Sequence, residues 1–201
     1  MMKTLTRRNL VLGLALAGGL GLSGTALAQS AITKQVGSPA PVVTSNISEA
    51  DVLSAQRAWG DALVQISKDF ESGGIAKAKA TANAVLDAAY GYQFGPVLFK
   101  PTLTTAPQTF RTTKEGALAY FVGDNKAFPG DTGFALKGWR SVEIKNVALQ
   151  LHGDTALSMG NVSITDKSGK VTTVDKTWGY VRDDKGALRI GLHHSSLPVA
   201  K

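Results

Sequence analysis

The sequence predicts an α+β fold, in which a strongly curved antiparallel sheet wraps around a long N-terminal helix. Helical hydrophobic spacing is confined to the first half of the domain, and strand patterns fill the chain from Phe134 to Pro198. Helices followed by strands are typical of an α+β arrangement. The apolar alternation also slips in two neighbouring strands, which predicts the curvature, because one extra residue bends a strand.

Residues 1–28 predict an export signal peptide that is not part of the fold. A cationic start that includes Arg7 and Arg8 precedes an apolar run from Leu10 to Leu22, and small residues end at Ala28. The general secretory route and the twin-arginine route both fit this pattern. The run is shorter than the roughly 20 apolar residues of a membrane helix, and no later stretch approaches that length. We therefore expect a periplasmic or secreted protein, cleaved after Ala28, with no membrane span.

Residues 29–46 contain Ser, Thr and Pro and little charge, which predicts a flexible tether before a single domain at residues 47–198. The domain opens on Ser48-Glu49-Ala50-Asp51, a capping box whose hydroxyl and carboxylate satisfy free amides of the first turn. A long helix should run from there to Gly73-Gly74, and an alanine-rich helix from Ile75 to Ala89. The apolar face of the long helix consists of Val52, Ala55, Trp59, Leu63, Ile66 and Phe70.

The stretch from Tyr90 to Thr102 is aromatic and interrupted by Gly and Pro, which predicts a loop and a short strand. Thr112-Thr113-Lys114-Glu115 repeats the spacing of a capping box and predicts a short third helix that carries Tyr120. From Phe134 onward we expect four strands in an antiparallel meander. Three turn signals separate them: His152-Gly153-Asp154, Asp166-Lys167-Ser168-Gly169 and Asp183-Asp184-Lys185-Gly186.

The apolar alternation slips in two of these strands. In one strand, the phase of Val142 and Ile144 does not continue into Val147, and in the next strand the phase changes across Gly160. An extra residue at each slip would change the direction in which the following side chains point and would increase the local bend. We therefore expect the sheet to be strongly curved.

The end of the last strand carries a candidate polar site. Because successive strand residues point to opposite faces, His193 and Ser195 share one face, and His194 lies on the apolar face of Ile190. Only one face can point into the curved sheet, and it is the face of Ile190 unless a bulge near Gly191 changes the phase or a dimer covers both faces. The same pattern also fits a polar strand end with satisfied hydrogen bonds and no function.

Composition and charge exclude several classes of function. The 201-residue chain has 22 Lys and Arg against 15 Asp and Glu, but no basic run, so we expect no nucleic-acid partner. The absence of cysteine excludes thiolate chemistry and cysteine-ligated zinc. The two adjacent histidines point apart and His152 is expected in a turn, which disfavours a histidine-based zinc site. Trp59, Trp139 and Trp178 are expected to be structural.

Five stretches of the chain resemble the iota-class carbonic anhydrases, which have the cone fold of the nuclear transport factor 2 superfamily, a cystatin-like α+β roll. The similarity extends from about Ile47 to Pro198 and covers nearly all of the expected mature chain. Its motifs are long and irregular. The stretches are residues 90–102, 109–112, 116–121, 133–139 and 193–198.

The resemblance implies a homodimeric enzyme that interconverts carbon dioxide and bicarbonate in a largely apolar pocket. It implies that Thr102 and Ser195 hydrogen-bond bicarbonate and the attacking water. Tyr120 would donate to the developing oxyanion, and His193 would accept or relay the proton. No cofactor is expected, although some members of the family are reported to work with zinc or manganese.

Two other interpretations of the same fold stay open. A non-catalytic module that binds a small ligand or associates subunits would have the same pocket without turnover. An enzyme similar to ketosteroid isomerase or to the polyketide cyclases would need a carboxylate base deep in the pocket, and the sequence offers no clear candidate for it.

Overall fold

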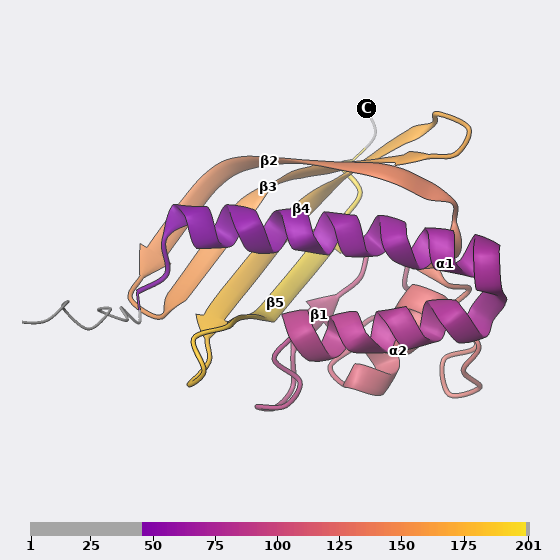
Figure 1. Ribbon diagram of the computed structural model, residues 1–201, viewed down its shortest axis with the longest axis horizontal. Coiled ribbons are helices and arrows are strands. Elements are labelled where there is room, and N and C mark those ends of the chain that lie inside the picture. The colour runs from indigo at the N-terminus through magenta and orange to yellow at the C-terminus, as the bar shows by residue number, and fades with distance from the viewer. Residues whose placement is uncertain (1–45, 200–201) are drawn as a thin grey trace, which may run out of the picture. The chain divides into compact units, whose positions relative to one another are not determined.

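The computed structural model describes residues 46–199 (Figure 1). The expected signal peptide at residues 1–28, and all of the expected tether except its last residue, lie outside the described residues. No helix within residues 46–199 is both long enough and apolar enough to cross a membrane. The elements are, in order, α1 (Glu49–Ala89), β1 (Leu98–Lys100), α2 (Lys114–Val122), the 3-10 helix η1 (Phe134–Leu136), β2 (Trp139–His152), β3 (Thr155–Asp166), β4 (Val171–Arg182) and β5 (Leu188–Ser196).

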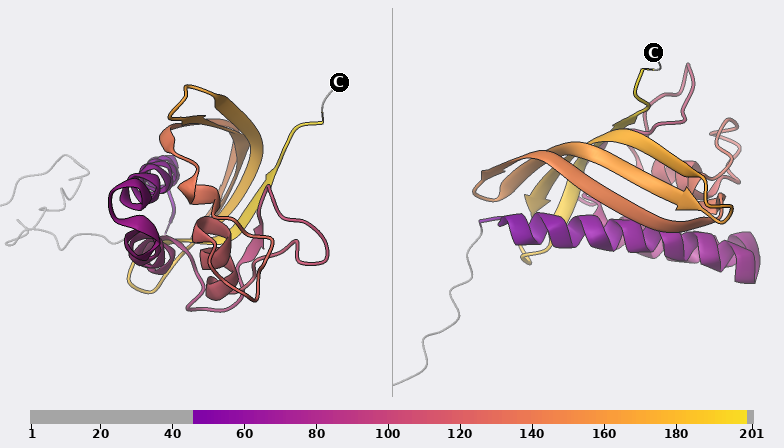
Figure 2. Two further views of the ribbon diagram at one scale, coloured as in Figure 1. Left: turned by 90° about the vertical axis from the view of Figure 1, so that its right-hand side faces the viewer. Right: turned by 90° about the horizontal axis from the view of Figure 1, so that it is seen from above.

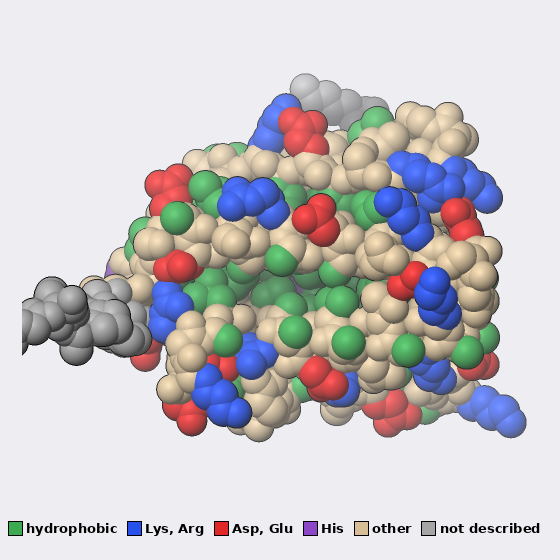
Figure 3. Space-filling model, in the orientation of Figure 1, with side chains coloured by type: hydrophobic (Ala, Val, Ile, Leu, Met, Phe, Trp, Pro, Cys, Tyr) green, Lys and Arg blue, Asp and Glu red, His purple; other side chains and the backbone are tan. Residues whose placement is uncertain are grey.

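Helix α1 consists of two helical arms that meet at Gly74, where the sequence predicts the break (Figure 1). The φ of Gly74 is 68° and its ψ is −166°, a conformation that a residue with a side chain rarely adopts. The predicted capping box opens the first arm, because the backbone N–H of Asp51 donates to the Ser48 hydroxyl at 3.2 Å. The Ser48 N–H in turn donates to the Asp51 carboxylate at 2.9 Å. Hydrophobic side chains line the hollow between the two arms (Figure 3).

Helix α2 begins one residue later than the sequence predicted. Thr113 is its N-cap, and the Thr113 hydroxyl accepts a hydrogen bond from the backbone N–H of Gly116 at 3.2 Å. The expected capping box with Thr112 as the cap is wrong, because the carboxylate of Glu115 accepts from the side-chain amide of Asn125 at 3.0 Å instead. The helix itself and the place of Tyr120 on it are confirmed.

Strands β2 to β5 form the predicted antiparallel meander, and β1 adds a parallel edge strand beside β5. The order in the sheet is β1-β5-β4-β3-β2. The sheet curls over one side of α1 (Figure 2), and Trp59 and Leu63 of the first arm share a core with Val162 and Trp178 of the sheet. The α+β cone is therefore confirmed, with β1 as a parallel addition to the antiparallel meander.

The expected slip of β2 is a β-bulge at Val147. This residue is the extra one between Asn146 and Ala148, which pair with Gly160 and Met159 of β3. The side-chain amide of Asn146 exchanges two hydrogen bonds with that of Gln56 in α1, at 2.8 and 2.9 Å. The bulge is thus tied to the helix at the point where the sheet bends around it.

The expected slip of β3 is wrong. Strand β3 pairs with β4 without interruption across Gly160. Leu157 and Met159 lie on the outer face of the sheet, 45% and 58% exposed, whereas Val162 and Ile164 are buried in the core. A strand with apolar residues on both faces gives the same sequence pattern as a strand in which a bulge changes the alternation. The sequence pattern alone therefore could not distinguish the two arrangements.

Candidate active site

A β-bulge at Gly191 turns His193 toward the inside of the cone. The pairing of β5 with β4 shifts register between Ile190 and Leu192, so Gly191 is the extra residue. Ile190, His193 and Ser195 are consequently all buried. Of the two alternatives that the sequence left open, a bulge near Gly191 and a dimer that covers both faces, the bulge is present.

The four predicted site residues line one small cavity inside the cone. About 10 Å³ of it is open to the centre of a water molecule, which is room for about one water. Both helices, η1 and three strands contribute to its walls, which are mostly aromatic or aliphatic. The lining residues are Trp59, Phe99, Pro101, Thr102, Tyr120, Phe121, Phe134, Val174, Lys176, His193 and Ser195.

Two hydroxyl groups meet at one end of this cavity. The Oγ1 of Thr102 and the Oγ of Ser195 lie 2.5 Å apart. They meet because β1 runs parallel to β5, with Phe99 opposite His193, so that the chain leaving β1 passes beside the end of β5. One hydroxyl donates to the other, which leaves one O–H and several lone pairs for a ligand.

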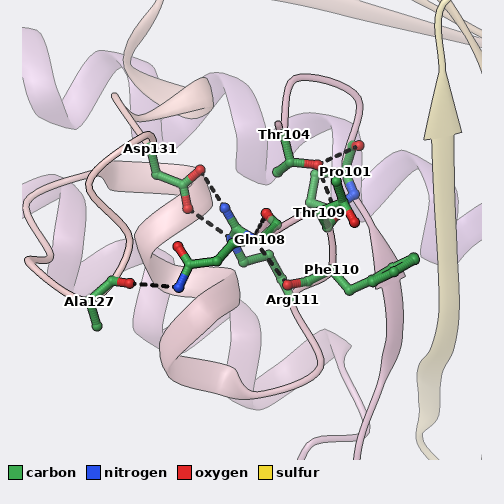
Figure 4. A network of polar contacts seen from close by, with 8 residues as sticks. All are labelled: Pro101, Thr104, Gln108, Thr109, Phe110, Arg111, Ala127 and Asp131. Atoms are coloured by element: carbon green, nitrogen blue, oxygen red, sulfur yellow. Dashed lines mark hydrogen bonds and ion pairs between the residues drawn. The ribbon is translucent and has the colours of Figure 1, made fainter. Parts of the chain in front are cut away.

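The loop that carries Thr102 is anchored by the buried Arg111 (Figure 4). The guanidinium of Arg111 donates to both carboxylate oxygens of Asp131 at 2.8 Å. It also donates to the backbone carbonyls of Gln108 at 2.7 Å and of Phe110 at 3.0 Å. These contacts fix the loop between β1 and α2, and with it the position of the Thr102 hydroxyl.

Helix α2 supplies the third hydroxyl, that of Tyr120. Its ring stacks on Phe134 of η1, with ring centroids 5.4 Å apart. Burial raises the pKa of Tyr120, and hydrogen bonds from the backbone N–H groups of Leu103 and Thr102 oppose this rise only in part. The phenol is therefore protonated at neutral pH and has a proton to donate.

His193 has a protein partner at each ring nitrogen. Its Nδ1 lies 2.9 Å from the hydroxyl of Tyr90, and its Nε2 lies 2.8 Å from the Nζ of Lys176. The ring of Phe99 stacks on the imidazole, with centroids 4.3 Å apart. Burial, and then the charge of Lys176, hold the pKa of His193 well below its usual range, so the imidazole is neutral at neutral pH.

Lys176 is a residue of the cavity that the sequence analysis did not single out. Its side chain is 5% exposed, and its Nζ lies 4.9 Å from the ring centroid of Trp59 and 5.4 Å from that of Trp178. Burial lowers the pKa of Lys176 to about 7. The signal was present in the alternation of Val174, Lys176, Trp178 and Tyr180, where one lysine occupies an inward position of an apolar strand.

One of the tryptophans, Trp59, does more than fill the core. Trp59 lines the cavity, and its indole N–H donates to the hydroxyl of Tyr90 at 3.0 Å. Trp178 packs edge-on against Trp59, with centroids 5.6 Å apart. Trp139 has the structural role expected of it, since its indole N–H donates to the carbonyl of Phe134 at 2.7 Å. Tyr90, like Lys176, was missed as a contact of the imidazole.

The donor groups around the cavity do not form a metal site. Among residues 46–199, no three His, Cys, Asp or Glu side chains lie together so that they could hold one metal ion. Both nitrogens of His193 are occupied by Tyr90 and Lys176, and His152 lies exposed at the end of β2. No carboxylate occurs among the described residues that line the cavity, so the base that a ketosteroid isomerase requires is not present there.

Comparisons with known proteins identify the family of the chain. The family described as metal-independent carbonic anhydrase matches residues 50–197. A curated metal-independent carbonic anhydrase from Nostoc sp. (strain PCC 7120 / SAG 25.82 / UTEX 2576) is 65% identical over 158 residues, which are 79% of this chain and 77% of that protein. The crystal structure of an iota-carbonic anhydrase from a cyanobacterium, complexed with bicarbonate, is 64% identical with a TM-score of 0.79, and the match covers 81% of this chain and 99% of that chain.

The family match covers most of the chain, and identity above 60% extends over about four fifths of it. The zinc or manganese alternative is not supported, because the matching family is metal-independent and the described residues offer no cluster of metal ligands. The chain therefore belongs to the metal-independent, iota-class carbonic anhydrases, and it catalyses the reversible hydration of carbon dioxide to bicarbonate.

Proposed function

We propose that the cavity formed by Thr102, Tyr120, His193 and Ser195 is the place where carbon dioxide is hydrated. The observation that carries this assignment is their convergence on one cavity. Thr102 and Ser195 are 93 residues apart in the sequence, yet their hydroxyls are in hydrogen-bond contact. The bicarbonate complex of the related cyanobacterial enzyme supports an anion site in this fold.

The walls of the cavity suit a neutral gas. Phe99, Phe121, Phe134 and Val174 present hydrocarbon surface to the reacting centre. Carbon dioxide has no net charge and needs few hydrogen bonds, so walls of this chemical character suit it. The small volume also limits the number of competing waters, which strengthens each remaining polar contact.

The hydroxyl groups hold the two reactants in line. In this proposal, Thr102 and Ser195 orient the attacking water and hydrogen-bond the bicarbonate that forms. Tyr120 donates to the oxygen on which negative charge grows. His193, which joins Lys176 and Tyr90 in a chain of hydrogen bonds, belongs to the path of the released proton.

Orientation replaces the activation that zinc provides in other enzymes. Bound zinc lowers the pKa of water from 15.7 to about 7, and hydroxyl groups do not produce that shift. Holding the reactants in a near-attack geometry contributes up to about 7 to 11 kcal/mol in the best intramolecular cases. A positioned proton acceptor adds roughly another 10² to 10⁴ in rate. These two contributions are what the cavity has to supply.

Two conservative substitutions test the assignment. Ser195→Ala and Tyr120→Phe should each lower the rate of carbon dioxide hydration by at least about tenfold in a stopped-flow indicator assay, because each removes one hydrogen-bonding group. Thermal unfolding should stay nearly unchanged, since neither change leaves a large void. Ser141→Ala on the exposed side of β2 is the matched control. Full rates in both site variants would place the reaction elsewhere.

We also propose that the protein acts as a homodimer in which the outer faces of two sheets meet. Leu157 and Met159 are exposed on this face. Leu192 adjoins Leu157 across Gly179, and Leu98 is paired with Leu192 on the edge strand. An apolar patch on a sheet face is typical of an interaction surface. Light scattering should give the mass of a dimer, and Met159→Lys should give a monomer; a wild-type monomer at every concentration would refute this.

We further propose that the protein is exported to the periplasm or secreted, with cleavage after Ala28. The support is the pattern of residues 1–28, in which cations precede an apolar run and small residues. Cell fractionation with N-terminal sequencing should find a product that begins at Gln29. Replacing both Arg7 and Arg8 by Lys should block a twin-arginine route and leave general secretion intact. Uncleaved protein in the cytoplasm alone would contradict export.

A further inference from the structure

The hydration of carbon dioxide releases a proton, and one of the cavity groups has to receive it. Of the polar side chains in the cavity, the hydroxyls of Thr102 and Ser195 are not bases at neutral pH. Tyr120 is protonated, because burial raises the pKa of its phenol. The remaining groups are the imidazole of His193 and the amine of Lys176.

His193 has no ring nitrogen left for the attacking water. Its Nδ1 contacts the Tyr90 hydroxyl at 2.9 Å, and its Nε2 contacts the Lys176 Nζ at 2.8 Å. The indole N–H of Trp59 also donates to the Tyr90 hydroxyl, at 3.0 Å. The hydroxyl next to Nδ1 therefore already has two protein partners. A proton from cavity water would reach the imidazole directly only if one of these contacts broke.

Lys176 is differently placed. Besides its bond to carbon, the nitrogen of a neutral lysine amine has two N–H groups and one lone pair. The contact with His193 uses one of these three positions. The amine lines the cavity and lies near the faces of Trp59 and Trp178. Lys176 forms no ion pair with a carboxylate within residues 46–199, so no fixed negative charge holds it in the ammonium form.

We propose that Lys176 takes the proton from the attacking water, and that His193 is a positioning residue that holds the amine of Lys176 toward the cavity. This inference rests on the proposed function and deepens it. It assigns the base of the reaction to a residue outside the four that the sequence indicated, and it makes the imidazole of His193 the support of that base.

The proton balance of the step is complete within the cavity. The water oxygen forms a bond to the carbon of carbon dioxide, and one C=O electron pair moves to a carboxylate oxygen. The O–H bond of the water breaks, its proton goes to the lone pair of the Lys176 amine, and the products are bicarbonate and an ammonium. In dehydration the ammonium returns this proton to the hydroxyl oxygen of bicarbonate as the C–O bond breaks. After hydration, the ammonium loses its proton to solvent or buffer once bicarbonate has left.

The hydrogen bond to His193 can persist through both protonation states. The ammonium has only donors, so in that state Nε2 accepts from Nζ and the imidazole proton is on Nδ1, directed at the Tyr90 oxygen. The neutral amine keeps an N–H for Nε2 and gains a lone pair that is free to point into the cavity. The imidazole therefore needs no change of tautomer during turnover.

Lys176 is also the cavity group whose charge changes near neutral pH. Burial lowers the pKa of its amine to about 7. The other ionisable groups that face it or its partner are Tyr120 from α2, Tyr90 from the end of α1 and His193 from β5. All three are neutral at pH 7, because burial raises the pKa of both phenols and lowers that of the imidazole. The charged, ammonium form of Lys176 therefore attracts the bicarbonate anion, whereas the neutral amine form does not.

Substitutions at Lys176 test whether this residue acts as a base or only supplies a positive charge. Lys176→Met should lower kcat for hydration by at least about 100-fold and abolish the dependence of kcat/KM on a group near pH 7. Lys176→Arg keeps a positive charge and cannot act as a base, so the KM for bicarbonate should stay within about threefold while kcat is not restored. The exposed Lys145→Met is the matched control with unchanged rates. Full activity in Lys176→Met, or a restored kcat in Lys176→Arg, would overturn the proposal.

The positioning role of His193 has its own readout. His193→Gln keeps an amide oxygen that can accept from the amine of Lys176, so it should retain more activity than His193→Leu. Both variants should move the midpoint of the pH profile, because the amine loses or changes its acceptor. An unchanged midpoint in both would show that His193 does not position the amine of Lys176.

A measurement on the wild-type domain does not depend on whether the variants fold. Nuclear magnetic resonance of protein labelled with ¹³C at lysine Cε should show one resonance that titrates near pH 7, and bicarbonate should raise that midpoint. If every lysine titrates above pH 9, the proposal is wrong. The Ser195→Ala variant distinguishes failure of this inference from failure of the proposed function. If Ser195→Ala is slow and Lys176→Met has the wild-type rate, the cavity is the reaction site but Lys176 is not its base. If both variants have the wild-type rate, the cavity is not the reaction site.

Discussion

The guanidinium of Arg111 and the carboxylate of Asp131 form a two-pronged ion pair that is almost completely buried. Each of the two hydrogen bonds is 2.8 Å long, and each side chain is 3% exposed. The pair connects the loop after β1, which carries Thr102, to the loop that follows α2, and the ring of Phe128 covers the guanidinium. The position of the Thr102 hydroxyl, which we propose to be part of the reaction site, therefore depends on an ion pair that does not itself line the cavity.

Removing one partner of this pair should destabilise the fold. Asp131→Asn leaves the Arg111 charge buried without its counter-ion, so we expect the free energy of unfolding to fall by about 3 to 5 kcal/mol. Chemical denaturation measures this change, and the hydration rate should fall as the Thr102 loop loosens. The exposed pair of Lys145 and Glu143 is the control, because Glu143→Gln should cost less than about 1 kcal/mol. Equal effects from the two variants would contradict the anchoring role.

Gly160 should not tolerate a side chain. A Cβ at this position would lie 2.0 Å from the backbone carbonyl oxygen of Lys145, at the bulge of β2. Because backbone has to move to relieve this clash, Gly160→Ala should lower the free energy of unfolding by about 2 to 4 kcal/mol in chemical denaturation. Gly191→Ala is the matched bulge control: no atom lies within 4 Å of its Cβ position, so its stability should change by less than about 1 kcal/mol.

The stability of the domain should depend on pH through Lys176. The pKa of this amine is about 7 in the folded chain, against 10.5 for an ordinary lysine. Between these values the unfolded chain binds more protons than the folded chain, so this group makes stability rise with pH. Lys176→Met removes the effect. The stability advantage of Lys176→Met over wild type should therefore be largest at pH 7 and shrink by up to about 4 kcal/mol toward pH 10.

Thermal or chemical unfolding of both proteins across this pH range provides the measurement. Groups that do not interact with Lys176 titrate alike in both proteins and cancel in the difference. A difference that stays constant from pH 7 to pH 10 would show that Lys176 keeps an ordinary pKa in the fold.

The sequence predicted those parts of the site that depend on local pattern. The alternation along the last strand placed Ile190 and His193 on opposite faces. The resemblance, which implies that His193 lies in the pocket, then left a bulge near Gly191 or a dimer as alternatives, and the structure has the bulge. The resemblance to the family supplied Thr102 and Tyr120, which no local pattern distinguishes from a loop cap and a half-buried helix residue. The glycine pair at residues 73–74 likewise marked the break in α1.

The contacts of the imidazole depend on the tertiary fold and were not predictable from local pattern. Tyr90 reaches His193 across 103 residues of sequence. A parallel bridge between Tyr90 and Ile190 brings the end of α1 against β5, ahead of the parallel pairing of β1 with the same strand. Lys176 left a detectable signal, an inward lysine among apolar residues of β4, but its contact with His193 follows from the register of two strands. The slip expected in β3 failed because Leu157 and Met159 are apolar residues of an outer face.

The rate of carbon dioxide hydration by metal-depleted protein tests most directly whether the side chains of this cavity suffice for the reaction. The domain would be chelated exhaustively, its metal content determined by elemental analysis, and its rate measured by stopped flow beside Ser195→Ala treated in the same way. We predict an unchanged wild-type rate at far less than one metal ion per chain, with the variant at least about tenfold slower. A collapse of the wild-type rate that zinc or manganese restores would contradict the account.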